Sequence, residues 1–438
     1  MSITELIKGK SFDEIKCLEE GNIRVRTLNA TEVFKKLFLL VSKTMTSMFD
    51  RRVNGQIFEK GTNELVAESM EGVYEDQSLS DLNDFLSPSD LSDSAEPLYS
   101  EENEVYVEYA EDGTMIRLYN YLGEWYTATT RCIGGEYSYW SSREENFDKM
   151  FRSCLVGFDY SLLDSGMTYN FVLKHVNNRL VVSHSKNELV FVSSISRATS
   201  RESLACPKCL DSFVVRGVSV DTSELVFSDT EKFDEYDGSE RYQSWYSSEF
   251  SVKLGDASRV WSESELEALL AQSFTSTKKG IIFMKRVGNK YRRYLYETSQ
   301  YKKIKDLKGN TPNVLLSFLD LYTKGSESDT GMFFGVFGEY SDRFNEIMVG
   351  LDVLCDTIYN KYYDSHVKQR YRVSESDKHH RTLRQLHAVH KQSGRPIHLD
   401  TTRDLIYNLD SKIILRLLGM TLSKPKPKTI LRRGEVLE

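Results

Sequence analysis

The segment from Glu104 to Ile133 constrains the fold most, because it has the pattern of consecutive β-strands separated by glycine turns. Apolar and other residues alternate from Val105 to Tyr109, which predicts a strand with two different faces. Asp112-Gly113 is a strong turn signal, after which Met115 to Tyr121 returns as a second strand. A further glycine turn leads into a third strand, Trp125 to Thr129. The sequence therefore predicts three strands in succession.

Length and composition set the limits for the rest of the chain. With 438 residues, of which 40% are hydrophobic and 28% charged, we expect a soluble globular protein of two or three domains. The longest apolar run, Leu37 to Val41, is too short to span a membrane, and the N-terminus lacks the pattern of a secretory signal. Six scattered cysteines favour a reducing compartment. We therefore expect a cytoplasmic protein without membrane contact.

The spacing of apolar residues predicts further elements. Asn54 to Phe58 followed by Glu64 to Ala67 indicates a hairpin, and Val33 to Met48 has helical spacing. Tyr137 to Cys154 is expected to be a loop followed by a helix. The C-terminal part of the chain is typical of an all-helical region, with apolar residues at helical spacing in Val314 to Tyr322, Arg343 to Tyr363, Arg381 to Lys391 and Thr401 to Leu418.

Charge is segregated along the chain, so the net charge of −8 is a poor guide to its partners. Residues 71–104 contain eleven acidic side chains and no lysine or arginine. This segment is either a disordered or loosely helical insertion, or an interaction segment that binds a protein partner or competes with RNA for a basic groove. The final residues, 421–438, are expected to form an extended basic tail.

The opposite charge is concentrated in residues 278–310, which contain eleven basic and two acidic side chains. Four tyrosines, at positions 291, 294, 296 and 301, lie among them. Lysine and arginine neutralise phosphates, and tyrosine rings stack on unpaired bases, so this mixture favours RNA binding. The alternative is a solvated strand face at a sheet edge.

Two clusters could bind metal. Cys206 and Cys209 form a CxxC pair without a second pair at finger-like spacing, which leaves open a surface turn, half of a zinc site or redox chemistry. Six of the eight histidines lie between His366 and His398. His387 and His390 share a helix face, for which we weigh metal binding against packing or RNA contact. We assign no metal site from either cluster.

Several blocks in order resemble one known family. Ala110-Glu111-Asp112-Gly113 followed by two strands resembles the nucleotide-attachment region of the RNA ligase branch of the covalent nucleotidyltransferases, especially the ligase-like proteins of phages and large DNA viruses. Tyr169 to Leu173, the Asn178-Arg179 block and Lys279-Gly280 are similar to later blocks of that family. The resemblance implies an α+β fold: an adenylation domain of antiparallel sheets with flanking helices (1–310, with the acidic insertion at 71–104), then an α-helical domain (311–420) that contacts RNA in the family.

The same resemblance places unusual residues at the catalytic positions. Ala110 stands where the family has the lysine that attacks the α-phosphate of ATP, and an alanine side chain has no nucleophile. Val172 stands in the place of a glutamate that helps to hold the nucleotide and metal, and Lys279 in the place of a second glutamate. Asn54 and Leu295 replace basic residues. Asp112 and Gly113 match the family motif. Together these replacements indicate a scaffold that has lost catalysis and binds no metal.

Three functions follow from these features. The first is an RNA ligase-like pseudoenzyme that binds RNA or nucleotide phosphates through a basic cleft, with the contacts expected from Arg117, Arg131, Lys279, Lys285, Arg292 and Arg293. The second is an active ATP-dependent RNA ligase, using ATP and Mg²⁺, in which Lys174, Lys278 or Lys279 is a displaced nucleophile. The third is a structural or virion-associated interaction protein. If the source is viral, the host cytoplasm or the virion is the expected location.

Overall fold

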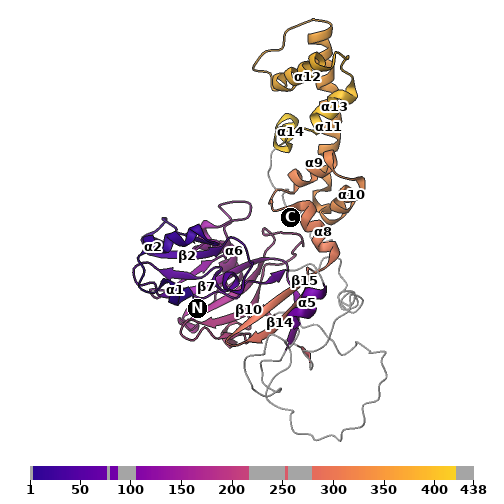
Figure 1. Cartoon of the computed structure of the whole chain (residues 1–438). Helices are drawn as coiled ribbons and strands as arrows, with labels where there is room; N and C mark the ends of the chain where they lie inside the picture. The colour runs from indigo at the N-terminus through magenta and orange to yellow at the C-terminus, as the bar shows by residue number, and fades with distance from the viewer. Residues whose placement is uncertain (1–2, 76–78, 87–104, 217–251, 255–278, 421–438) are drawn as a thin grey trace, which may run out of the picture. The chain divides into compact units, whose positions relative to one another are not determined.

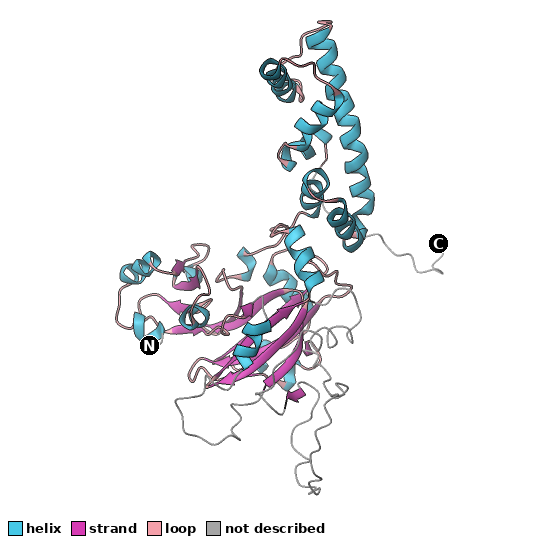
Figure 2. Ribbon diagram, turned by 45° about the vertical axis from the view of Figure 1, so that its right-hand side comes forward, coloured by secondary structure: helices cyan, strands magenta, loops and turns pink. Residues whose placement is uncertain are grey.

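A computed structural model describes residues 3–75, 79–86, 105–216, 252–254 and 279–420. The chain divides into two units, Met1–Lys302 and Lys303–Glu438. Unit 1 contains the β-sheets and unit 2 the long C-terminal helices (Figures 1 and 2). The expected α+β class, with antiparallel sheets and flanking helices followed by a helical C-terminal region, is confirmed.

The strands of unit 1 form three sheets, all with mainly antiparallel neighbours. Sheet A has the order β1 (Ile23–Arg26), β2 (Leu37–Ser42), β3 (Ile57–Glu59) and β4 (Leu65–Ala67). Sheet B has the order β13 (Val252–Leu254), β6 (Val105–Ala110), β14 (Gly280–Val287), β15 (Lys290–Glu297) and β5 (Tyr74–Glu75). Sheet C has the order β11 (Glu202–Ser203), β10 (Glu188–Ser196), β9 (Met167–Lys174), β7 (Thr114–Tyr121) and β8 (Glu124–Ala128), with β12 (Val215–Arg216) beside β10.

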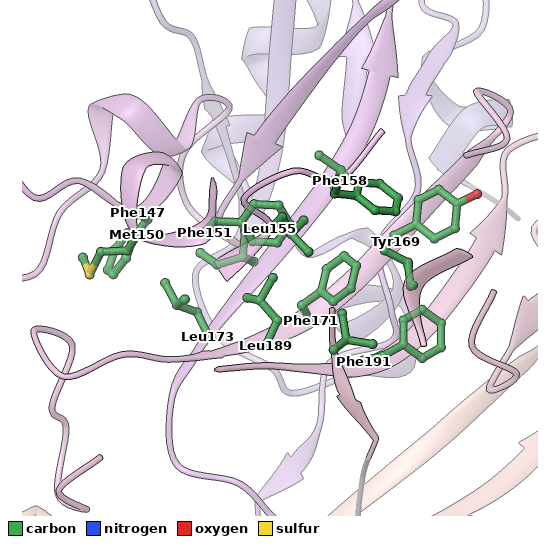
Figure 3. Packing of buried hydrophobic residues seen from close by; sticks show 14 of the residues in the cluster. Phe147, Met150, Phe151, Leu155, Phe158, Tyr169, Phe171, Leu173, Leu189 and Phe191 are labelled. Carbon is green, nitrogen blue, oxygen red and sulfur yellow. The ribbon is translucent and has the colours of Figure 1, made fainter. Parts of the chain in front are cut away.

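Short helices accompany the sheets in unit 1. They are α1 (Ile3–Ile7), α2 (Phe12–Lys16), α3 (Glu32–Lys35), α4 (Met48–Val53), α5 (Leu79–Leu86) and α6 (Phe147–Cys154). Helix α6 begins at the N-cap Asn146, whose side chain accepts a hydrogen bond from the Lys149 N–H. Figure 3 shows the apolar face of α6, with Phe151 and Leu155, against the sheet C residues Phe171 and Leu189. This core fills one face of sheet C and leaves the other face for the cleft described below.

Strand β2 corrects one prediction. We expected a helix over Val33 to Met48, but only Glu32–Lys35 is helical, and Leu37–Ser42 is a strand with every residue buried. The odd-numbered residues of β2 pack between sheets A and C, and Phe38 and Leu40 pack against α1 and α2. A strand buried on both faces is apolar at every position, so it has no alternation that would distinguish it from a helix.

The expected hairpin at Ile57–Glu59 and Leu65–Ala67 is confirmed, and so are the strands β6, β7 and β8. The second strand, however, does not return beside the first. Strand β6 pairs with β14 and β13 in sheet B, whereas β7 pairs with β8 and β9 in sheet C. The Asp112-Gly113 turn therefore moves the chain from one sheet to another.

The acidic segment 71–104 differs from a purely disordered insertion in its first part. Glu71 is buried, Tyr74 pairs with Tyr294 in sheet B, and α5 buries Leu82 in the core of the same sheet. Residues 76–78 and 87–104 lie outside the described residues, as does the basic tail 421–438. The part of the segment that is described completes sheet B.

The tyrosines of residues 278–310 also differ from our expectation. Tyr291, Tyr294 and Tyr301 are buried, and Tyr294 and Tyr296 belong to the core of sheet B. As placed, Tyr291, Tyr294 and Tyr301 offer no ring face to a base. The alternation in this segment therefore reflects packing on two faces of β15.

One buried carboxylate joins all three sheets. Glu68 follows β4 of sheet A, and its backbone N–H donates to Thr168 Oγ1 in sheet C over 3.2 Å. Its carboxylate accepts from Lys290 Nζ in sheet B over 2.6 Å and from Ser200 Oγ over 3.1 Å. The side chain is 2% exposed. Glu68 therefore fixes the relative positions of the sheets within unit 1.

Unit 2 consists of helices joined by short loops. Helix α8 (Ser299–Lys308) crosses the boundary between the units and is followed by α9 (Val314–Lys324), α10 (Glu327–Val336), α11 (Ser341–Tyr362), α12 (His380–Ser393), α13 (Leu399–Tyr407) and α14 (Ser411–Leu418). The helical regions predicted from periodicity are confirmed, and α10 was missed. Helix α10 has glycines at positions 331 and 335, which weaken a helical pattern.

Candidate functional site

Sheets B and C face each other across a cleft. In sheet B, Ala110 lies opposite Gly280 and Glu108 opposite Ile282, so these residues share one face. Arg293 extends from the same face to Glu202 in sheet C, where its Nη2 is 2.7 Å from a carboxylate oxygen of Glu202. Both side chains are almost completely buried. This ion pair connects the two sheets at one end of the cleft.

The cleft begins where the chain crosses from β6 to β7. The buried carboxylate of Asp112 accepts hydrogen bonds from the backbone N–H groups of Val181 and Val182, over 2.9 and 2.7 Å, and from the Tyr301 hydroxyl over 2.6 Å. Gly113 is required beside it, since a Cβ there would lie 2.6 Å from the carbonyl oxygen of Leu173. The Asp-Gly pair thus has a structural role that does not depend on catalysis.

Ala110 lines a cavity of about 340 Å³, which we call the alanine cavity. Charged groups of both signs surround the methyl group. The lining residues are Tyr109, Ala110, Glu111, Asp112, Lys174, Val182, Ser183, His184, Ser185, Lys186, Glu188 and Lys279.

Lys174 is the amine with the most partners in the alanine cavity. Its Nζ lies 2.9 Å from Glu111 and 3.6 Å from Glu188, and all three side chains are partly buried. Glu188 faces Lys174 directly across strands β9 and β10. Lys186 and Lys279, in contrast, form no ion pair with a described residue. The cavity therefore contains one neutralised and two available lysines.

His184 adds a neutral group to the alanine cavity. Burial lowers the pKa of its imidazole, so the ring is uncharged at neutral pH. Its Nε2 is buried without a hydrogen-bond partner among the described residues.

A second cavity lies along the same face of sheet C. Its volume is about 550 Å³, and we call it the methionine cavity, because three methionines line it. The lining residues are Met45, Arg51, Asn54, Ser69, Met70, Glu71, Gly72, Val73, Glu75, Met115, Arg117, Thr130 and Asn170.

The cations of the methionine cavity are already engaged. Arg117 donates to the carbonyl oxygens of Gly55 and Thr129, and burial lowers the pKa of its guanidinium to about 10. Gly55 has a φ of 95°, and a Cβ at this position would lie 3.2 Å from Arg117 Nη1. Arg51 donates to the carbonyl oxygen of Val73 over 2.7 Å. These contacts leave little free positive charge in this cavity.

Glu108 lies on the cleft face of β6 between the two sheets. Burial raises the pKa of its carboxyl group to about 7, although the nearby Arg293 acts in the opposite direction. A carboxyl group with this pKa is partly protonated at neutral pH.

The structure brings only some of the predicted site residues together. Ala110, Asp112 and Lys279 line the alanine cavity, Arg117 and Asn54 line the methionine cavity, and Val172 lies on the strand β9 between them. Arg131 is exposed at the end of β8. Lys285 and Arg293 are buried in sheet B, and Arg292 lies 3.8 Å from buried Glu71.

Several residues that line the cavities were not predicted from the sequence. Asn170, Ser69 and the three methionines come from four separate segments, and no motif links them. Glu111 and Glu188 become partners of Lys174 only through the register of β9 and β10 and the turn after β6. The sequence offered one signal for these residues, the alternation along Asn170, Val172 and Lys174.

The described residues do not fit a protein-held Mg²⁺ ion. Glu111 and Glu188 are paired with Lys174, and Asp112 already accepts three hydrogen bonds. Within the described part of the chain, no group of three or more His, Cys, Asp or Glu side chains has a metal-binding arrangement. We therefore derive no chemical step through a metal.

The remaining clusters are placed as follows. Cys206 and Cys209 pack against the core between α6 and sheet C. His366, His387 and His390 lie in a row, with successive ring centroids 4.8 and 6.1 Å apart.

In the described residues, no helix has the length and apolar content needed to cross a bilayer.

No family model and no curated protein sequence matches this chain. Among solved structures, it is similar to an archaeal ATP-dependent RNA ligase in two forms. The TM-scores are 0.39 and 0.40, the sequence identities 12% and 14%, and the matches cover 77% and 78% of this chain and 73% and 78% of the ligase chain. At this level of similarity we transfer no residue's role from the ligase.

Proposed function

We propose that unit 1 binds the phosphates of a nucleotide, or of an RNA end, in the cleft between sheets B and C without covalent attachment at position 110. The observation that carries this proposal is the alanine cavity. Lys186 and Lys279 line it without a carboxylate partner among the described residues, around a methyl group that cannot act as a nucleophile. Phosphate oxygens are suitable partners for such lysines.

The arrangement of the negative charges supports the proposal. Glu111 and Glu188 both pair with Lys174, and Asp112 accepts hydrogen bonds from two backbone N–H groups and a phenol. An entering phosphate would therefore meet two unpaired lysines and no unpaired carboxylate inside the cavity. The ligand would be held by charge and position alone.

Titration of the full chain with ATP and with single-stranded RNA tests this function. Lys279→Ala should weaken binding about tenfold, and affinity should fall as salt rises. Lys149→Ala is the matched control, because Lys149 is an exposed lysine on α6, at the opposite face of sheet C. Affinity that is absent at low salt, or equal losses in both variants, would contradict the proposal.

One observation favours a second candidate, an active ligase with a displaced nucleophile. Lys174 Nζ shares the alanine cavity with Ala110 and is 2.9 Å from a carboxylate of Glu111. Transfer of its proton to Glu111 would free the amine to attack the α-phosphorus of ATP. An N–P bond would form, and the bond to the leaving pyrophosphate would break.

Incubation with radiolabelled ATP and Mg²⁺ separates the two candidates. The pseudoenzyme gives no labelled protein band. The displaced nucleophile gives an acid-labile adduct that maps to Lys174 and disappears in Lys174→Arg. Lys174→Arg keeps the positive charge but removes the nucleophile at neutral pH, so it leaves phosphate binding intact under both candidates.

A further inference from the structure

The methionine cavity contains two buried polar atoms that have no hydrogen-bond partner among the described residues. Asn170 is 0% exposed, and its amide nitrogen donates to the backbone and hydroxyl oxygens of Ser193 over 3.4 and 3.3 Å. Within the part of the chain that the structure describes, no group bonds to its Oδ1 or to the hydroxyl of Ser69, which is 4% exposed. Buried polar groups in folded proteins are nearly always paired, so these two atoms point to a ligand.

The ligand group that fits this cavity is neutral and flat. The buried charges, Arg117 and Glu71, already have partners within the protein. Met45, Met70 and Met115 offer thioether side chains, which make favourable contacts with aromatic rings. A volume of about 550 Å³ is within the range of sites for small organic ligands. A heteroaromatic base satisfies these conditions.

The two cavities are in line with each other. Asn170 lines the methionine cavity and Lys174 the alanine cavity, and both side chains lie on the same face of β9 with Val172 between them. Four residues along a strand span about 13 Å. This is comparable with the distance from the base to the outer phosphates of an extended nucleoside triphosphate.

We propose that the methionine cavity holds the base of the bound nucleotide, and that Asn170 selects a base with an exocyclic amine. This inference rests on the proposed phosphate site in the alanine cavity. The amine donates one hydrogen to Asn170 Oδ1, and the Ser69 hydroxyl bonds to a ring nitrogen. The three methionines contact the ring faces. A base without the amine leaves the Asn170 oxygen unpaired in a dry site, which weakens its binding.

Calorimetric titration with matched ligands tests the proposal. ATP is compared with purine riboside triphosphate, which lacks only the amine, and with inorganic tripolyphosphate, which lacks the nucleoside. We expect ATP to bind at least tenfold more tightly than purine riboside triphosphate. Asn170→Leu should reduce this ratio to about one and leave tripolyphosphate binding unchanged. Lys279→Ala should weaken all three ligands and leave the ratio intact.

The outcomes separate the two proposals. If all three ligands bind with equal affinity, the base assignment is overturned and the phosphate site stands. If none binds, both are overturned. Because Asn170→Leu could disturb β9, Ser69→Ala serves as a second variant. It should weaken ATP and purine riboside triphosphate alike, several-fold, without a change in their ratio, in tripolyphosphate binding or in melting temperature. Unchanged affinity for both purine nucleotides in a folded Ser69→Ala protein would count against the assignment.

Discussion

The alanine cavity and the methionine cavity lie on one face of sheet C but differ in what they leave unpaired. Among the described residues, two lysines of the alanine cavity lack carboxylate partners, whereas in the methionine cavity the charges are engaged and an amide oxygen and a hydroxyl have no partner. The first is suited to an anion and the second to a neutral ring. Neighbouring cavities on one strand can thus divide the recognition of a single ligand.

The largest effect is expected from a substitution that disturbs both cavities. Arg293→Met leaves the carboxylate of Glu202 buried without its partner, since the two groups are 2.7 Å apart and almost inaccessible. We expect a loss of about 3–5 kcal/mol in unfolding free energy, measured by urea denaturation. Lys16→Ala, which breaks an exposed ion pair with Asp13, is the control and should change stability little. Equal effects would contradict a connecting role for Arg293.

A smaller effect concerns the pH dependence of the whole cleft. Burial raises the pKa of Glu108 to about 7, so the folded protein binds this proton more tightly than the unfolded chain does. The stability contributed by the protonated group is complete below the ordinary pKa of a glutamate and is lost as pH rises toward and above 7. Glu108→Gln should therefore stabilise the protein at pH 8 by up to about 3 kcal/mol. Thermal melts at pH 5 and pH 8 measure it, and a gain equal at both values would exclude this explanation.

The next prediction affects the alanine cavity alone. Tyr301→Phe removes the hydroxyl that donates to Asp112 over 2.6 Å and leaves the two backbone donors in place. Hydrogen bonds to charged groups contribute about 1.5–3 kcal/mol, so we expect a loss of about 2 kcal/mol in unfolding free energy. Tripolyphosphate affinity should fall while the preference for ATP over purine riboside triphosphate persists. A change in that preference without a loss of tripolyphosphate affinity would contradict the separate roles of the two cavities.

The smallest effect is expected in the methionine cavity. Met115→Leu conserves volume, so it should cost less than about 1.5 kcal/mol of stability. Loss of the thioether should weaken ATP two- to fivefold, by about 0.4–1 kcal/mol, without altering tripolyphosphate binding. Calorimetry of ATP and tripolyphosphate on the variant measures both effects. Weaker tripolyphosphate binding would mean that the phosphates, too, contact this cavity.

The sequence predicts those parts of the fold that are encoded locally. Strands β6, β7 and β8 follow from alternation and glycine turns, and most helices of unit 2 follow from their spacing. The prediction for β2 was wrong, because burial of both faces of the strand removes the alternation of apolar and polar residues. The assignment of β6 and β7 to different sheets was not predictable, since a turn signal does not specify which strand will be the neighbour.

The candidate site was less predictable than the fold. Ala110 and Lys279 were predicted from their motif positions, and both line the alanine cavity. The partners of Lys174 depend on strand register, and the methionine cavity combines segments more than a hundred residues apart, from Met45 to Asn170. Burial also changed the interpretation of Arg293, whose charge meets a carboxylate inside the protein. Charge counted along a sequence does not reveal which side chains reach solvent.

The position of Glu68 has a consequence for how unit 1 comes apart. The carboxylate of Glu68 accepts from Lys290 and Ser200, and its backbone N–H donates to Thr168. This single residue therefore has contacts with all three sheets. Detaching sheet A or sheet B would leave a buried charge of the Glu68–Lys290 pair without its partner, and detaching sheet C would break the hydrogen bonds of Glu68 to Thr168 and Ser200. Partial opening is therefore penalised, and the sheets should melt in a single cooperative transition. Replacement of this one side chain would then be expected to split that transition and to populate a partly unfolded intermediate.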